Sequence, residues 1–237
     1  MINLIMPMAG DGIRVKDAGI AKPLIPISGI PMFCWALESV NVPVNYIFIV
    51  RDNHVNEYGI DRTIAQYFPS SKVIVQNGRL NGPAHSVMEA RDLITDAPLI
   101  IMDCDMYLNI DYTEAIKAIG DFDGGIGTFL NTSPQYSYIS RSESGLIDDI
   151  KEKEVIGSEA VAGSYFWSEG THFVNYYSNA LKTATPNKEL YISDVYKKAL
   201  RDNKKMLPIL AKYCYDMSTK EGMDNFMLNR GLLDLSR

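Results

Sequence analysis

Cysteine is scarce in this sequence, and its scarcity argues against two kinds of site. The 237 residues include three cysteines, Cys34, Cys104 and Cys214, which are odd in number and far apart. A cysteine-based metal site uses closely spaced pairs, and the disulfide framework of a small secreted domain normally uses an even number. We therefore expect three reduced thiols in a cytoplasmic protein.

Long apolar runs are also missing. No run approaches the roughly 18 residues that are needed to span a bilayer, so we expect no membrane segment. The apolar stretch at residues 2–9 has no basic flank and is soon followed by Asp11 and Arg14. These features argue against a signal peptide and agree with a cytoplasmic location.

Positive charge is in deficit. Lys and Arg number 23 against 29 Asp and Glu, which gives a formal net charge of -6. Proteins that bind a nucleic-acid backbone generally present a basic face, so we expect no nucleic-acid partner. Phosphate binding in so acidic a chain must rest on a few local cations, which suits a small phosphorylated ligand in a pocket.

Apolar residues make up 46% of the chain, which is enough to fill a core. In the first half, short β-rich runs alternate with segments of helical periodicity. This pattern predicts an α/β fold with a Rossmann-like, doubly wound and mainly parallel sheet. Strands are expected at residues 3–6, 46–50, 72–75 and 99–102, and helices at residues 32–40, 55–68 and 84–93.

The pattern changes after Ile119. Short apolar runs separated by turn residues predict antiparallel strands that extend the sheet or form a small subdomain. They lie at residues 124–130, 136–140, 145–150 and 161–167, followed by helices at 171–183, 192–203 and 220–233 and a strand at 206–210. No linker, repeat or low-complexity tract interrupts the chain, so we expect one domain over residues 1–237.

A glycine-rich segment, Met8-Ala9-Gly10-Asp11-Gly12, follows the first predicted strand. Glycines there let the backbone turn sharply and bring its amides against phosphate oxygens. The spacing matches neither the dinucleotide fingerprint nor the P-loop. By itself the segment is equally compatible with an ordinary turn after a strand.

Two carboxylates, Asp103 and Asp105, follow the strand predicted at residues 99–102. Aspartate is a poor strand former and is costly to bury unpaired. Mg²⁺ takes carboxylate and phosphate oxygens as ligands, so this strand end predicts a magnesium site. A capping pair or a surface turn is the alternative interpretation.

Three segments near the N-terminus together resemble the signature of the sugar-phosphate nucleotidyltransferase family. That signature is a Gly-x-Gly-Thr-Arg loop, a Pro-Lys-Pro-Leu segment and a Gly-Lys-Pro-Met helix start. The matching segments here are Gly10-Asp11-Gly12-Ile13-Arg14, Ala21-Lys22-Pro23-Leu24 and Gly29-Ile30-Pro31-Met32. Ile13, Ala21 and Ile30 depart from the family pattern.

Further matches to the same family follow in order along the chain. They are Gln76 with Asn81-Gly82-Pro83-Ala84, Asp105, Glu152-Lys153, Gly163-Ser164-Tyr165, the segment 189–194 and the segment 213–221. We interpret residues 189–194 as mainly structural. Without the resemblance, the Lys/Glu run at 151–154 is typical of a solvated face, and Asp216 or Thr219 is typical of a helix N-terminus.

The resemblance implies a role for each matched residue. Arg14 would hold the departing pyrophosphate, Lys22 the α-phosphate and Lys153 the acceptor phosphate. Asp105 and Asp216 would bind Mg²⁺. The nucleotide-binding residues would be Met8, Ala9, Gly10, Asp11, Gly12, Gln76, Gly82, Pro83, Ala84 and Asp103, and the acceptor-binding residues Glu152, Lys153, Gly163 and Tyr165, with Trp167 as a further aromatic candidate.

The family implies a fold of the nucleotide-diphospho-sugar transferase type, with a nucleotide-binding half at residues 1–119 and an acceptor-binding half at 120–237. It also implies transfer of a nucleotidyl group from a nucleoside triphosphate to a phosphorylated small molecule, and it is compatible with a homo-oligomer. The short members include cytidylyltransferases. They favour CTP, an acceptor of the sugar 1-phosphate, phosphocholine or phosphoglutamine type, and a role in capsule or surface-polysaccharide synthesis.

Two other functions stay open. A GT-A type glycosyltransferase also presents Asp-x-Asp at a strand end, but it lacks the Gly-x-Gly-x-Arg and Lys-Pro-Leu pair. A nucleotide-binding sensor without catalysis is left open by the substitutions at Ile13 and Ala21 and by Ser218, which stands where the family segment matched by residues 213–221 has glycine.

Overall fold

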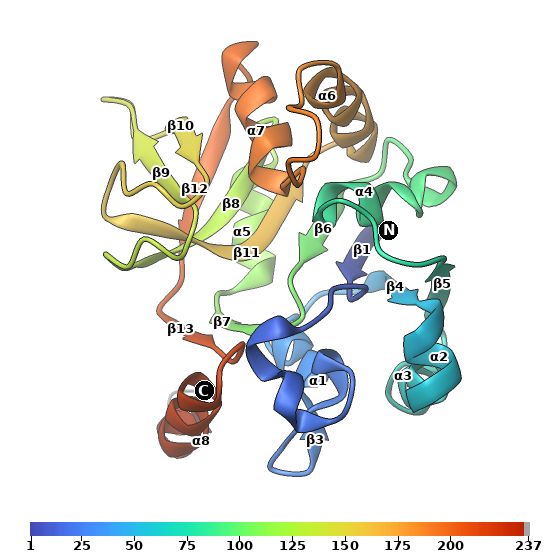
Figure 1. The fold of residues 1–237 in the computed structure, drawn as a ribbon. Coiled ribbons are helices and arrows are strands. Elements are labelled where there is room, and N and C mark those ends of the chain that lie inside the picture. The colour runs from blue at the N-terminus through green and yellow to red at the C-terminus, as the bar shows by residue number, and fades with distance from the viewer. Residues whose placement is uncertain (235–237) are drawn as a thin grey trace.

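A mixed sheet of nine strands forms the centre of the molecule (Figure 1). The computed structural model describes residues 1–234, apart from the side chains of Arg14, Lys16 and residues 231–234. The strand order is β5-β4-β1-β6-β11-β8-β12-β10-β9. The bounds are β1 Ile2–Pro7, β4 Val44–Arg51, β5 Lys72–Gln76, β6 Leu99–Met102, β8 Gly124–Leu130, β9 Tyr138–Arg141, β10 Ile147–Lys151, β11 Glu159–Trp167 and β12 Met206–Leu210.

The first four strands in this order are parallel, with Leu4 of β1 facing Tyr46 of β4 on one side and Ile100 of β6 on the other. Strand β11 runs antiparallel to both β6 and β8, and β9 and β10 form an antiparallel pair at the far edge. The predicted doubly wound sheet with an antiparallel extension is confirmed.

Helices cover both faces of the sheet. They are α1 Met32–Leu37, α2 Asp52–Tyr58, α3 Ile60–Tyr67, α4 Pro83–Met88, α5 Tyr112–Ile119, α6 Gly170–Lys182, α7 Ile192–Arg201 and α8 Lys220–Asp234. Figure 1 shows α6 and α7 on the opposite side of the sheet from α1 and α8.

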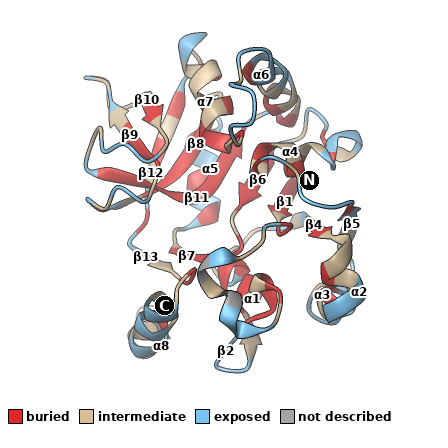
Figure 2. Cartoon of the chain, in the orientation of Figure 1, coloured by how far each residue is buried: buried red, intermediate tan, exposed pale blue. Residues whose placement is uncertain are grey.

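Two apolar cores follow from the alternation of side chains along the strands. Leu4 and Met6 point into the core that contains α1 and α3, whereas Ile5 points into the core that contains α4, α6 and α7. Because both faces are covered, the central strands are buried throughout, as Figure 2 shows for β6 and β11. This burial explains why they read as continuous apolar runs rather than alternating ones.

Some predicted elements differ from the observed ones. The helix expected at residues 55–68 is two helices, because Gly59 adopts a left-handed conformation (φ 62°) that ends α2 and starts α3. The helix expected at 84–93 ends at Met88 and is followed by a short 3₁₀ turn, Arg91–Leu93. Helix α5 was not expected, although the Asp111 side chain caps it by accepting hydrogen bonds from the next helical amides.

A small second sheet extends from the carboxyl end of β6. It pairs β7 Met106–Asn109 with β13 Tyr213–Asp216 in antiparallel fashion. A third, two-stranded sheet, β2 Pro26–Ile27 with β3 Ile30–Pro31, precedes α1. Because β1, β5 and β6 run parallel in the main sheet, the loops that follow them meet at one edge of that sheet. Ligands bind at this edge in open α/β folds.

Candidate active site

Two adjoining pockets lie at this edge. The loop pocket has a volume of about 290 Å³ and is lined by residues 8–13, Gln76, Arg79, Leu80, Gly82 and Ser86. The carboxylate pocket has a volume of about 420 Å³ and is lined by Asp103, Asp105, Asp216, Tyr136, Glu152, Lys153, Gly163, Tyr165 and Tyr191. Both are also lined by Pro7, Gly10, Lys22, Pro83, Cys104 and Glu189, so the two pockets share a wall.

The glycine loop forms one side of the loop pocket. Gly12 has φ +59°, and a Cβ added there would lie 2.8 Å from Cβ of Lys22. Glycine is therefore required for the loop to pack against Lys22. A Cβ at Gly10 would meet nothing within 4 Å, so the backbone there faces open space that a ligand can approach.

Lys22 lies at the junction of the two pockets. It starts a 3₁₀ turn, Lys22–Leu24, whose proline and leucine are buried and anchor it to the core. Its Nζ donates a hydrogen bond to Oδ2 of Asp105 at 2.7 Å, and both side chains are mostly buried. The described part of the chain thus places one cation against both the glycine loop and the aspartate after β6. The Arg14 side chain lies outside the described residues.

Asp105 and Asp216 meet through the small second sheet. The β7–β13 ladder pairs Met106 with Asp216, and the amide of Met217 donates to the carbonyl oxygen of Asp105 at 2.8 Å. The Asp216 carboxylate is held on both oxygens, by the Tyr136 hydroxyl at 2.9 Å and the Ser218 amide at 2.8 Å. Two aspartates that are 111 positions apart in the printed sequence are therefore brought to one pocket.

Asp103 adds a third carboxylate to this pocket. Burial and the neighbouring Asp105 carboxylate raise the pKa of Asp103 to about 7. Gly163, in a bulge of β11 with φ +67°, gives it room, because a Cβ there would lie 2.5 Å from Oδ2 of Asp103. Asp103 lines the carboxylate pocket and not the loop pocket, although the sequence assigned it to the nucleotide.

These carboxylates suit a hard cation. Among the described residues, no group of three or more His, Cys, Asp or Glu side chains is arranged to hold a metal by itself. Mg²⁺ does not need such a cage, since it is commonly bound by one or two carboxylates together with substrate phosphates and water. Burial is the main cause of the raised pKa of Asp103, and the neighbouring Asp105 charge, the next cause, is one that a cation would offset.

Gln76 ends β5 and is almost fully buried beside the loop pocket. Its Nε2 donates to the carbonyl oxygen of Gly78 at 2.9 Å, whereas its buried Oε1 has no hydrogen-bond partner among the described residues. The hydrogen bond to Gly78 thus fixes the orientation of the Gln76 amide, and Oε1 can still accept a hydrogen bond. A buried acceptor without a partner is costly, so this atom is a candidate contact for a donor on a ligand.

The segment 82–84 has a structural explanation of its own. Gly82 has φ +119°, and a Cβ there would lie 2.4 Å from the carbonyl oxygen of Leu190. Close packing against Leu190, rather than room for a base, therefore accounts for the glycine. Pro83 lines both pockets, but Ala84 is buried in the core and its amide donates to the carbonyl oxygen of Leu190.

The residues matched to acceptor binding line the carboxylate pocket together. Glu152 accepts hydrogen bonds from the hydroxyls of Ser137 and Ser193. Lys153 adopts a left-handed conformation (φ 55°), and its Nζ lies 3.3 Å from the Tyr191 hydroxyl.

The aromatic residues of β11 divide between this pocket and the core. Tyr165 lines the pocket. Trp167, proposed as a pocket residue, is instead buried in the core against the rings of Tyr176 and Tyr196. Its position two residues further along β11 carries it away from the edge where the pocket lies.

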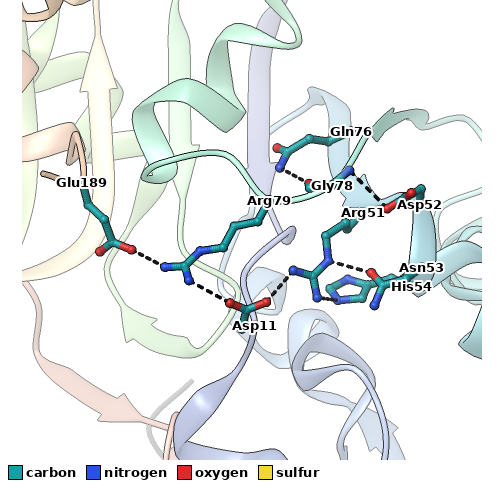
Figure 3. Close-up of polar contacts among 9 residues, drawn as sticks. All are labelled: Asp11, Arg51, Asp52, Asn53, His54, Gln76, Gly78, Arg79 and Glu189. Atoms are coloured by element: carbon teal, nitrogen blue, oxygen red, sulfur yellow. Dashed lines mark hydrogen bonds and ion pairs between the residues drawn. The ribbon is translucent and has the colours of Figure 1, made fainter. Parts of the chain in front are cut away.

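Sequence reasoning missed a polar chain beside the loop pocket (Figure 3). Arg51 donates to Asp11, Asp11 also contacts Arg79, and Arg79 donates to Glu189. Arg51 ends β4, so the rule that ligands bind at carboxyl strand ends could have identified it. Glu189 lies in a segment that matched the family but was interpreted as structural.

A doubly wound sheet with two adjoining pockets at its carboxyl edge is the arrangement of nucleotide-diphospho-sugar transferases. The sequence matches the nucleotidyl transferase family model over residues 5–219. The chain belongs to the nucleotidyl transferase family, whose members are enzymes that transfer a nucleotidyl group.

Solved structures share this fold. The nucleoside-diphosphate-sugar pyrophosphorylase from Vibrio cholerae RC9 aligns with a TM-score of 0.78 at 16% identity, covering 95% of this chain and 99% of that one. A UDP-glucose pyrophosphorylase complexed with UDP-glucose gives 0.77 at 17% identity, covering 98% and 99%. The inositol-1-phosphate CTP transferase from T. maritima gives 0.73 at 14% identity, covering 93% and 90%.

A comparison with curated proteins found no match. At the identities of the solved structures, the likeness shows the fold. Within residues 1–234, no helix is both long and apolar enough to cross a membrane.

Proposed function

We propose that the protein transfers a nucleotidyl group from a nucleoside triphosphate to a phosphorylated small-molecule acceptor and releases pyrophosphate. The observation that carries this proposal is the position of Lys22, which lines both pockets and holds Asp105 at 2.7 Å. The α-phosphate must lie where the two substrates meet, and a cation at that junction is where opposing negative charges need to be offset.

The reaction needs alignment more than covalent chemistry by the protein. An oxygen of the acceptor phosphate forms a bond to the α-phosphorus while the bond to the bridging oxygen of the β-phosphate breaks, and its electron pair leaves with pyrophosphate. Lys22 would contact the α-phosphate and Lys153 the acceptor phosphate. Two pockets with a shared wall support this in-line geometry, and no side-chain nucleophile is required.

Asp105 and Asp216 are the residues that would hold Mg²⁺, with Asp103 close behind them. When bound, the ion would supply charge neutralisation for the reacting phosphates. Tyr136 and the Ser218 amide fix the orientation of the Asp216 carboxylate, which favours a ligand role over a flexible surface carboxylate. The role of Arg14 at the departing pyrophosphate rests on the family resemblance.

CTP is our proposed triphosphate, so that CMP is transferred. The buried acceptor of Gln76 would pair with a donor such as the 4-amino group of cytosine. The solved T. maritima structure of the same fold is an inositol-1-phosphate CTP transferase. We further propose a sugar 1-phosphate, phosphocholine or phosphoglutamine acceptor and a cytoplasmic role in capsule or surface-polysaccharide synthesis, as in the short members of the family.

A pyrophosphate-release screen tests this function. Each common triphosphate and, in parallel, each common nucleotide sugar is combined with each acceptor type, with Mg²⁺ and with excess chelator. We expect release that needs a triphosphate, an acceptor and the metal, with CTP preferred. Consumption of a nucleotide sugar without pyrophosphate would indicate a glycosyltransferase, and binding of triphosphate without turnover in any combination would indicate a sensor.

A further inference from the structure

Glu189 lies between the two pockets and commits one carboxylate oxygen to each. Its Oε1 accepts a hydrogen bond from Nη2 of Arg79 at 2.6 Å, and its Oε2 accepts one from the Tyr191 hydroxyl at 2.6 Å. Arg79 lines the loop pocket and Tyr191 lines the carboxylate pocket, whereas Glu189 lines both. One side chain therefore joins the walls of both proposed substrate sites.

On the nucleotide side, Arg79 is shared by two acids (Figure 3). Its Nη1 lies 3.1 Å from Oδ2 of Asp11, on the glycine loop, while its Nη2 contacts Glu189. Asp11 is held in turn by Arg51 through its other oxygen. Arg79 lines the loop pocket and its side chain is 54% exposed, so a ligand in that pocket can reach it.

On the acceptor side, the chain of donors continues from Tyr191. The Tyr191 hydroxyl accepts from Nζ of Lys153 at 3.3 Å while it donates to Glu189. The ammonium also lies 5.2 Å from the centre of the Tyr191 ring. The hydrogen bond from Tyr191, followed by Arg79, lowers the pKa of Glu189 and keeps the carboxylate ionised.

A triphosphate entering the loop pocket competes with these acids. Its charge repels Asp11 and Glu189, and the planar fork of an arginine is suited to phosphate oxygens. Arg79 has donors to spare for a nucleotide, but its contact with phosphate oxygens strengthens as Glu189 and Asp11 share less of its charge. The strength of the hydrogen bond between Arg79 and Glu189 depends in turn on how much of the Glu189 carboxylate charge is shared with the Tyr191 hydroxyl.

We propose that Glu189 is a positioning residue that couples the two pockets. It stays hydrogen-bonded to Arg79 until a triphosphate binds that guanidinium. The loss of this contact then changes the hydrogen bond from Tyr191 to Glu189 and, through Tyr191, the position of Lys153 in the carboxylate pocket. This inference rests on the proposed function, and it adds a thermodynamic link between the two substrate sites. Since coupling is reciprocal, a change at Tyr191 must alter triphosphate affinity through Glu189.

A double-mutant cycle on triphosphate binding tests the link without an acceptor. The ligand is the α,β-methylene analogue of the triphosphate that the release screen selects, CTP in our proposal, titrated calorimetrically with Mg²⁺. We expect Glu189→Gln to tighten binding about threefold or more, because Arg79 is released and a negative charge is removed. Tyr191→Phe should weaken binding about threefold in the wild-type background, because the unshared carboxylate then holds Arg79 more firmly.

The decisive comparison is the Tyr191→Phe substitution made in the Glu189→Gln background, where we expect no change in affinity. Glu114→Gln on α5 is the control, because it removes one negative charge from an exposed i,i+3 pair with Lys117. Thermal melting of every variant checks that it folds.

Equal effects of Tyr191→Phe in both backgrounds, or no effect in either, would overturn the coupling while leaving the proposed function standing. Failure of the wild-type protein to bind the analogue at all would overturn both.

Discussion

Replacement of Asp105 by Asn should separate catalysis from stability. The Asp105 carboxylate pairs with Lys22 at 2.7 Å, with side-chain exposures of 11% and 19%. Loss of a hydrogen bond to a charged group destabilises a protein by about 1.5–3 kcal/mol. Here the loss should fall at the low end, because the substitution also removes the Asp105 charge, which after burial is the next cause of the raised pKa of Asp103.

The effect on turnover should be much larger. If Asp105 holds Mg²⁺ at the reacting phosphates, its loss should slow pyrophosphate release by about a thousandfold, which corresponds to about 4 kcal/mol of barrier. The assays are pyrophosphate release at saturating substrates and urea unfolding of the free protein. Release at the wild-type rate would refute the metal assignment.

Asp123→Asn provides a matched control. Asp123 makes an ion pair of the same length with Lys204, at 2.7 Å, with greater side-chain exposures of 24% and 28%, but it lines neither pocket. We expect a loss of stability at least as large, because Asp123 also accepts a hydrogen bond from the Lys205 amide, and an unchanged rate. If this variant lost as much activity as Asp105→Asn, the loss would reflect general destabilisation.

Three further predictions concern the loop pocket and the polar residues beside it. Gly12→Ala should lower the free energy of unfolding by about 1–2 kcal/mol through its positive φ and its contact with Lys22, whereas Gly10→Ala should leave stability unchanged and raise the KM for triphosphate. Gln76→Ala should reduce the preference for CTP over UTP about tenfold in kcat/KM, and an unchanged ratio would remove Gln76 from base recognition. Burial, then the Arg51 charge, lowers the pKa of His54, so it contributes stability that is present above about pH 6.5 and lost as the pH falls below that value. His54→Asn should flatten this slope, by up to about 1.4 kcal/mol per pH unit, in urea unfolding at pH 7.5 and 5.5.

The fold was predictable where local pattern decides the structure. Strands β6 and β12 begin and end at the predicted residues, because continuous apolar runs between turn residues leave little choice. Gly59 could have been recognised as a break between two helices, since a left-handed glycine is a common helix end. The strands β7 and β13 are only four residues each, and their pairing depends on chain segments about 100 positions apart.

The site was predictable in its parts but not in its connections. Strand-end reasoning located Asp103 and Asp105 without any structure, and the family resemblance supplied Lys22 and Asp216. The contact between Arg79 and Glu189 joins residues 110 positions apart, and no local pattern encodes it. Tertiary packing around Leu190 brings these two segments together.

In the proposed reaction, an acceptor phosphate attacks the α-phosphorus of a triphosphate at the junction of the two pockets, where Lys22 lies. The most direct measurement is mass spectrometry of the products formed from an acceptor whose non-bridging phosphate oxygens carry ¹⁸O. We predict that the nucleotide-linked product retains all of the label and that pyrophosphate carries none. Label in the released pyrophosphate, or release of free nucleoside monophosphate in place of a linked product, would contradict this reaction.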